Sequence, residues 1–144
     1  MTAGKEQIRG AGTSGVTPGV RETRLTDAVV ADVVAPAQAL GYVVFDVDLG
    51  GCYDKEGLLD RTARALSFPE WFGRNWDAWF DCLTDLNWQP RAPGYVLLLR
   101  RVARLRQTAP EALDTALAIL EDASRVWADR GVTWCTFVDA DHDA

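Results

Sequence analysis

Three short, unbroken apolar runs constrain the fold of this chain more than any other feature. They are Tyr42–Val47, Tyr95–Leu99 and Val132–Val138, each rich in aromatic or aliphatic residues. Runs of this kind are typical of strands that are covered on both faces, as in parallel sheets. Because segments with helical periodicity separate the runs, the sequence predicts an α/β fold, a single layered domain with a three-stranded parallel sheet packed by helices.

Signals for helix starts lie between these runs. Asp54 is the expected N-cap of one helix, and Asn75 is the expected N-cap of another that continues to about Leu86. The sequence Thr108-Ala-Pro-Glu111 matches a capping box and predicts a long helix that ends at about Arg130.

The chain divides into four predicted segments. Residues 1–23 hold five of the twelve glycines and almost no large apolar side chains, which indicates a flexible N-terminal arm. Residues 24–41 are predicted to form a short helical extension, which Pro36 divides into two pieces. Residues 42–139 form the main domain, and residues 140–144 an acidic tail.

Charge and composition exclude several classes of function. Fifteen Lys and Arg residues stand against 21 Asp and Glu, a net charge of −6. A protein that binds nucleic acid through bulk electrostatics has the opposite sign, so we expect no direct nucleic-acid partner and an attraction to basic proteins. No apolar run is long enough to span a membrane, and the first residues lack the apolar centre of a signal peptide. The expected location is therefore the cytoplasm.

The sequence predicts neither a metal site nor a cofactor. The three cysteines are far apart and fit neither a zinc site nor a disulfide framework. The acidic run Asp139–Asp143 lacks the Gly and the bidentate Glu of a calcium loop. Cys82 has no histidine near it in the sequence that could activate it, and is expected to be a buried small residue.

The segment that follows Asn75 carries the strongest functional signal. At 100° per residue, one face of the predicted helix holds the apolar side chains, and the opposite face holds carboxylates at i, i+4 steps. Like charges at that spacing destabilise a helix slightly, which favours a surface that recognises a cationic partner. The alternative is a solvated face, and for Asp77 the helix dipole offers a further explanation. The apolar residues are Trp76, Trp79, Phe80 and Leu83, and the carboxylates are Asp77, Asp81 and Asp85.

The segment Ser67–Leu86 resembles the signature of the barstar family, which are intracellular inhibitors of guanyl-preferring ribonucleases of the barnase type. The family pattern is approximately Leu-Pro-Glu-Tyr-Tyr-Gly-x-Asn-x-Asp-Ala-Leu-x-Asp-Cys-Leu-Thr. Here the segment from Phe68 to Thr84 reads FPEWFGRNWDAWFDCLT, which aligns without a gap over seventeen positions. The order of elements also agrees from Tyr42 to Val138.

This resemblance implies a barstar-like inhibitor domain over residues 42–139 and no enzymatic activity. In the family, a helix and the loop before it block the active site of the ribonuclease, with carboxylates in the place of RNA phosphates. The implied partner is a basic, extracellular-type ribonuclease similar to barnase, or a related cationic toxin. The alternative is an immunity or interaction protein that uses the same helix against a different cationic partner.

The resemblance also implies which residues contact the partner. Asp81 matches the dominant aspartate of the family and Asp77 its acidic neighbour, while Trp71 replaces a tyrosine that covers a catalytic histidine. A further carboxylate in the last helix is matched best by Asp122, with Glu121 as the alternative. Together with the acidic helix face, the implied partner-binding residues are Trp71, Asn75, Asp77, Phe80, Asp81, Thr84, Asp85 and Asp122.

Two regions depart from the family pattern. After Thr84 the family's Gly-Trp becomes Asp85-Leu86, and the following loop, Asn87–Gly94, is longer. A basic stretch is the second departure, and it indicates either a solvated face or a partner unlike the family's best-known ribonuclease. Its members are Arg91, Arg100, Arg101, Arg104 and Arg106.

An enzymatic alternative is weak. The sequence VVFDVDLGG resembles the strand and Asp-x-Asp start of aspartate-based phosphatases. Gly50 stands where that motif has Thr or Val, and no lysine follows Lys55. Asp77 and Asp81 as an acid/base pair would need a cleft with two different environments, which an exposed helix face does not offer.

Overall fold

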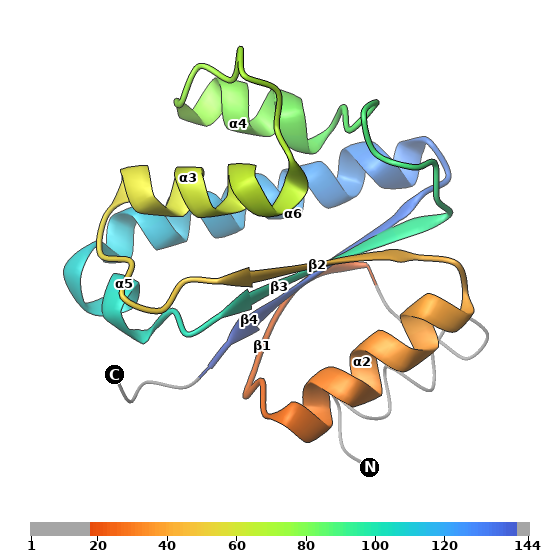
Figure 1. Ribbon diagram of the computed structural model, residues 1–144, viewed down its shortest axis with the longest axis horizontal. Coiled ribbons are helices and arrows are strands. Elements are labelled where there is room, and N and C mark those ends of the chain that lie inside the picture. The colour runs from red at the N-terminus through yellow and green to blue at the C-terminus, as the bar shows by residue number, and fades with distance from the viewer. Residues whose placement is uncertain (1–17, 141–144) are drawn as a thin grey trace.

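A computed structural model describes residues 18–140 of the chain, which form an α/β sandwich around one parallel sheet (Figure 1). The strand order is β1-β4-β3-β2, and all three pairs are parallel. The strands are β1 (Gly19–Thr23), β2 (Val43–Asp48), β3 (Gly94–Arg100) and β4 (Thr133–Asp139). The helices are α2 (Asp27–Ala39), α3 (Lys55–Leu66), α4 (Trp76–Leu83), α5 (Ala103–Thr108) and α6 (Pro110–Asp129).

The α/β class and the parallel sheet are confirmed, but the predicted number of three strands was wrong. The fourth strand, β1, pairs with β4 from Gly19 opposite Cys135 to Thr23 opposite Asp139. It is an edge strand with the mixed sequence GVRET, so it carries no continuous apolar run. Residues 19–23 are therefore part of the sheet rather than of an arm, and residues 1–17 of that predicted arm lie outside the described residues.

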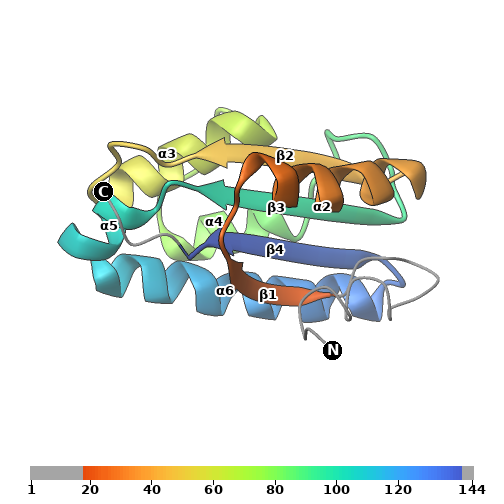
Figure 2. The same cartoon turned by 90° about the horizontal axis from the view of Figure 1, so that it is seen from below.

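Helices cover both faces of the sheet (Figures 1 and 2). On one face lie α3 and α6, with α4 stacked outside them, and on the other face lies α2. The side chains of β3 alternate between the two sides, since Leu97 and Leu99 belong to the larger core, and Val96 and Leu98 to the smaller core under α2. This burial on both faces explains why the sequence of β3 is apolar without a break from Tyr95 to Leu99.

The extension before β2 is one helix, which corrects the expected division at Pro36. Thr26 caps α2, because its Oγ1 accepts a hydrogen bond from the Val29 amide at 3.2 Å. Val33 and Ala37, on either side of the proline, are both buried against the sheet. Proline removes one backbone donor from the helix, and packing on this face offsets that loss.

The start of the longest helix also differs from the prediction. Ala109 and not Thr108 is the N-cap residue of α6, and it makes no side-chain cap. Thr108 ends the unpredicted helix α5, and its hydroxyl donates to the carbonyls of Tyr53 at 2.6 Å and Arg104 at 3.0 Å. The predicted cap at Asp54 is confirmed, since its Oδ1 accepts from the Gly57 amide at 2.9 Å.

None of the helices formed by residues 18–140 is both long and apolar enough to cross a lipid bilayer.

Candidate protein-binding surface

Helix α4 is the element that carries most of the predicted binding residues. Its N-cap is Asn75, as predicted, with Oδ1 accepting from the Ala78 amide at 2.8 Å. The helix ends at Leu83 and not at about Leu86, because the chain turns at Leu86 with a φ of +50°. Asp85 therefore lies just beyond the helix instead of on its last turn.

The inner side of α4 holds the helix in a fixed position. Of the four apolar residues predicted on this face, Trp79 and Leu83 are completely buried, while Trp76 and Phe80 are only half-buried. The rings of Trp76 and Trp79 meet edge to face with centroids 5.5 Å apart. The Lys55 ammonium lies 5.5 Å from the Trp76 ring centroid.

The outer side of α4 presents carboxylates to solvent. Asp77, Asp81 and Asp85 are all exposed, and within residues 18–140 none of their carboxylates forms an ion pair or hydrogen bond. Arg74, the nearest basic residue in the sequence, pairs with Asp60 at 3.2 Å and leaves Asp77 uncompensated. Three uncompensated negative charges on one side favour contact with a cationic surface.

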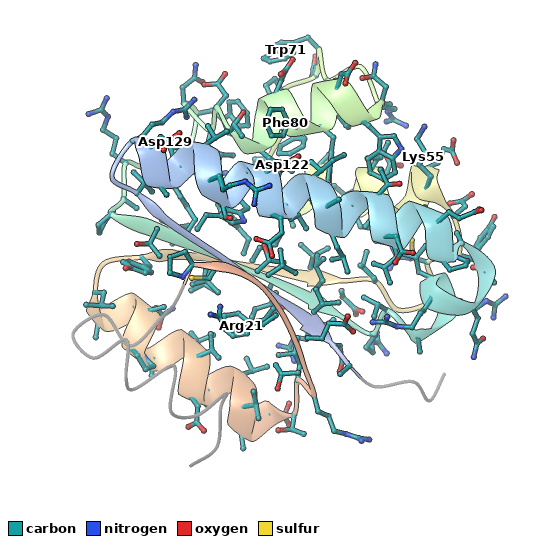
Figure 3. All side chains as sticks on the ribbon, turned by 180° about the vertical axis from the view of Figure 1, so that it is seen from behind. Arg21, Lys55, Trp71, Phe80, Asp122 and Asp129 are labelled. Carbon is teal, nitrogen blue, oxygen red and sulfur yellow. The ribbon has the colours of Figure 1, made fainter. Side chains whose placement is uncertain are left out.

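The loop before α4 leaves one large aromatic side chain in solvent. Its apolar residues pack inward, with the Phe68 ring 5.2 Å from Phe72 and 6.0 Å from Trp88. Trp71 lies between them in the sequence, yet it is 68% exposed. Figure 3 shows Trp71 on the outer side of α4, away from the sheet. Such an exposed indole is a common anchor in protein interfaces.

Two of the predicted contact residues have structural roles within α4. Asn75 is the N-cap, and Thr84 is buried, with its hydroxyl donating to the Phe80 carbonyl at 2.9 Å. The Thr84 carbonyl accepts a hydrogen bond from Arg130. These two residues thus fix the ends of the helix that carries the acidic side.

Helix α6 adds one carboxylate beside this surface. Asp122 is exposed and pairs with Arg125 on the same helix, whereas Glu121 is half-buried beside β1. Figure 3 shows Asp122 on the side of α6 that is turned away from the sheet. Of the two alternatives, Asp122 is the exposed one, whereas Glu121 lies near β1.

Most of the basic stretch after β3 is neutralised by ion pairs. Arg100 binds both carboxylate oxygens of Asp46, at 2.9 and 2.7 Å, and Arg101 binds both of Asp48, at 2.9 and 2.6 Å. The hydrogen bonds from Arg101 lower the pKa of Asp48 to about 2. Arg106 pairs with Glu22 at 3.1 Å, a contact between α5 and β1. These arginines therefore join strand ends and do not form a free basic face.

Enzymatic features are weak in the described part of the chain. No group of three or more His, Cys, Asp or Glu suited to a metal ion occurs within residues 18–140. Cys52, Cys82 and Cys135 are free and buried, and burial raises the pKa of each thiol, that of Cys135 to about 12. Burial and a raised pKa make a thiol a poor nucleophile at neutral pH.

A family model described as Barstar (barnase inhibitor) matches residues 42–139, the range from β2 to the end of β4. Strand β1 and helix α2 precede the matched range. A search of curated proteins finds no match.

Proposed function

Because this chain belongs to the barstar family, whose domain is that of a barnase inhibitor, we propose that it binds and blocks the active site of a barnase-type, guanyl-preferring ribonuclease. The contact surface is α4 with the loop that precedes it. The observation that carries the proposal is the outer side of α4 and the turn after it, where the carboxylates of Asp77, Asp81 and Asp85 are exposed and uncompensated within residues 18–140.

The chemistry of RNA cleavage explains why an acidic helix suits this task. A ribonuclease needs cationic side chains in its active site to hold the phosphates of its substrate. A row of carboxylates can occupy those positions, and complementary charge also speeds the encounter of the two proteins. Inhibition then follows from exclusion of RNA.

The structure of α4 supports tight binding. Asn75 caps the helix at its start, and the buried side chains of Trp79 and Leu83 hold its inner side. A surface that is already ordered loses little conformational entropy when it binds. The exposed Trp71 supplies an apolar anchor, and Asp122 extends the acidic surface onto α6.

Within this surface we assign the central position to Asp81. It lies in the middle of α4, one turn after Asp77, and within residues 18–140 its carboxylate makes no ion pair or hydrogen bond. We also place the protein in the cytoplasm, where thiols such as its three free cysteines remain reduced.

The test is an RNA-cleavage assay with a purified barnase-type ribonuclease. We expect the wild-type protein to inhibit at a one-to-one ratio. Asp81→Ala should weaken binding by about 2 kcal/mol or more, the range of hot-spot residues. Asp32→Ala is the matched control, because Asp32 is an exposed aspartate on α2, behind the sheet.

Two results would contradict the proposal. One is a folded wild-type protein that leaves RNA cleavage unchanged, and the other is undiminished inhibition by Asp81→Ala. The first result would favour the second candidate, an immunity protein for a different cationic toxin, which the departure from the family pattern at Asp85 and in the following loop supports. Whether the partner is a ribonuclease or another cationic toxin, raising the salt concentration should slow its association with the acidic surface.

A further inference from the structure

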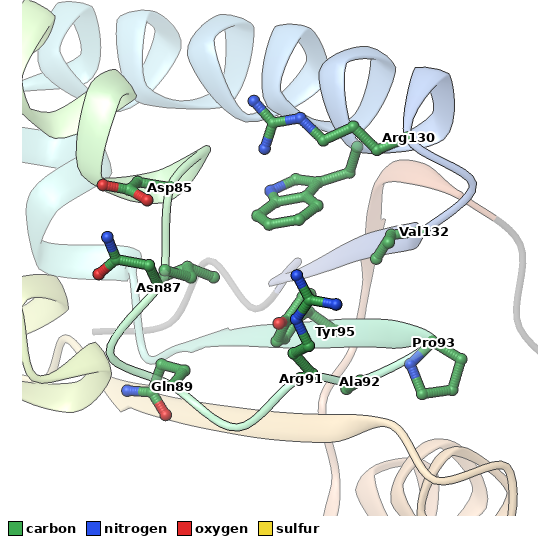
Figure 4. Close-up of a pocket in the computed structure, with 11 residues that line it drawn as sticks. Asp85, Asn87, Gln89, Arg91, Ala92, Pro93, Tyr95, Arg130 and Val132 are labelled. Carbon is green, nitrogen blue, oxygen red and sulfur yellow. The ribbon is translucent and has the colours of Figure 1, made fainter.

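A pocket of about 710 Å³ lies between the loop after α4 and the end of α6 (Figure 4). Its volume is in the range of cavities that bind ligands or side chains. The apolar lining includes the buried residues Leu86, Tyr95 and Trp127. Asp85 also lines it, so the pocket adjoins the acidic surface directly.

The charge of this pocket is opposite to that of the acidic surface. Its lining holds two arginines, Arg91 from the loop and Arg130 from the end of α6, against the single carboxylate of Asp85. Figure 4 shows the side chains of Arg91 and Arg130 on opposite walls of the pocket. A locally basic pocket therefore borders the acidic helix side.

Arg130 is held in place by its surroundings. One guanidinium nitrogen donates to the Thr84 carbonyl, and the guanidinium carbon lies 4.8 Å from the Trp127 ring centroid. No ion pair of Arg130 occurs within residues 18–140. Its remaining N–H groups can bind an anion.

Arg91 is exposed, and it forms no ion pair or hydrogen bond with any residue between 18 and 140. Arg91 lines the same pocket as Tyr95. Burial raises the pKa of the Tyr95 phenol, and the charge of Arg91 acts in the opposite direction. Within residues 18–140, Arg91 therefore lines the pocket without a counter-ion. A complementary charge on a bound partner can compensate such a charge.

We propose that this pocket receives an aspartate or glutamate side chain of the bound ribonuclease, held by the guanidinium groups of Arg91 and Arg130. The inference rests on the proposed function. A basic ribonuclease seated on α4 extends past Asp85, where two arginines would repel it unless it carries a carboxylate at that point. Arginine binds carboxylates with short, charge-assisted hydrogen bonds, and the aromatic wall accommodates the methylene groups of the side chain.

The proposal makes the pocket a determinant of specificity. A ribonuclease with a cationic active site and an adjacent carboxylate would satisfy both the acidic helix and the basic pocket. One with a cation at that position would be disfavoured by like charge. The inhibitor would thus distinguish among ribonucleases whose active sites are alike.

The proposal is tested by whether Arg91→Ala weakens or strengthens binding to the ribonuclease. With a barnase-type ribonuclease, Arg91→Ala should raise the dissociation constant roughly tenfold or more, mainly through faster dissociation. Arg91→Lys should restore part of the affinity. Arg104→Ala is the control, because Arg104 is an exposed arginine on α5, at the opposite end of the sheet (Figure 1). Arg130 is left intact because it also supports α4.

Unchanged or tighter binding by Arg91→Ala overturns the proposal, since removal of a cation that faces a cationic partner should improve affinity. Asp81→Ala in the same assay distinguishes a failure of the pocket proposal from a failure of the proposed function. If Asp81→Ala weakens binding and Arg91→Ala does not, only the pocket proposal fails. If neither variant changes binding, or if the wild type does not bind, the proposed function and the pocket proposal both fail.

A double-mutant cycle identifies the carboxylate on the partner. Each Asp or Glu around the active-site rim of the ribonuclease is neutralised in turn and combined with Arg91→Ala. One of them should show coupling, so that the loss from Arg91→Ala disappears once that carboxylate is gone. The absence of coupling at every position overturns the proposal. Binding of a short RNA by the inhibitor alone, lost in Arg91→Ala, also overturns it and assigns the pocket to nucleotides.

Discussion

Arg130, the residue that follows α6, donates a hydrogen bond to the backbone carbonyl of Thr84, the residue that follows α4. The last turn of α4 has unpaired carbonyl groups, as every helix end has, and here a side chain of the neighbouring helix satisfies one of them. The Trp127 indole satisfies a second, donating to the Leu83 carbonyl at 2.9 Å. The end of α6 thereby holds the end of the helix that carries the acidic surface.

Arg130→Met should destabilise the fold. The substitution keeps an apolar stem and removes the donor to the Thr84 carbonyl, so we expect the free energy of unfolding to fall by about 1 kcal/mol. Arg125→Met is the control, because Arg125 is an exposed arginine of α6 with only a surface ion pair to Asp122. Urea unfolding of both variants measures the difference, and equal effects would contradict a supporting role for Arg130.

The ion pair of Asp48 with Arg101 should produce an acid-dependent loss of stability. Hydrogen bonds from Arg101 lower the pKa of the folded protein's Asp48 from 3.8 to about 2. The folded state thus favours the ionised carboxylate. Its contribution to the free energy of unfolding is complete above about pH 4 and is lost as the pH falls toward 2. Asp48→Asn should therefore be less stable than wild type at pH 7, with the difference disappearing near pH 2. Urea unfolding at several pH values measures this, and a difference independent of pH would contradict it.

Leu83→Ala should affect folding, in contrast to Asp81→Ala two residues earlier on α4. Leu83 is completely buried in the larger core, so its truncation leaves a cavity and should cost about 2–5 kcal/mol. Asp81 is exposed, and Asp81→Ala should change the stability by no more than about 0.5 kcal/mol. Thermal unfolding of the two variants measures both effects. Equal stability of Leu83→Ala and wild type would contradict the burial of Leu83 in the core.

Two buried tryptophans, Trp134 and Trp79, allow the contribution of one indole hydrogen bond to stability to be measured. The Trp134 indole donates to the Thr136 hydroxyl at 3.0 Å, whereas the buried Trp79 indole has no acceptor within residues 18–140. Replacement by phenylalanine removes a similar volume from each site. Trp134→Phe should be the more destabilising, by about 1 kcal/mol, because it also leaves the Thr136 hydroxyl unpaired. Urea unfolding compares the two, and the reverse order would contradict the assigned bonding.

The parts of the fold that could be predicted from sequence are those with a local signal. The apolar runs at Tyr42–Val47, Tyr95–Leu99 and Val132–Val138 coincide with β2, β3 and β4 to within a residue or two. Asp54 and Asn75 act as N-caps through their own side chains, and a cap depends only on the next three residues. The helical periodicity after Asn75 also predicted correctly that Asp77 and Asp81 lie on the solvent side of α4.

The parts that could not be predicted depend on contacts between distant residues. Strand β1 has too few apolar residues to be recognised, and it exists because β4 offers it a partner. Pro36 was expected to break a helix that the sheet beneath it holds together. The pocket beside Asp85 is formed by a loop and by the end of α6, and nothing in the sequence indicates that Arg91 and Arg130 meet there.

The pairing of β1 with β4 has a consequence for the synthesis of the protein. Strand β1 has its only partner strand within residues 18–140 in β4, so β1 cannot join the sheet until β4 has left the ribosome. Pairings between residues so far apart in sequence form slowly. Until then the nascent chain exposes the apolar edge of β3, where it is open to aggregation or to capture by chaperones.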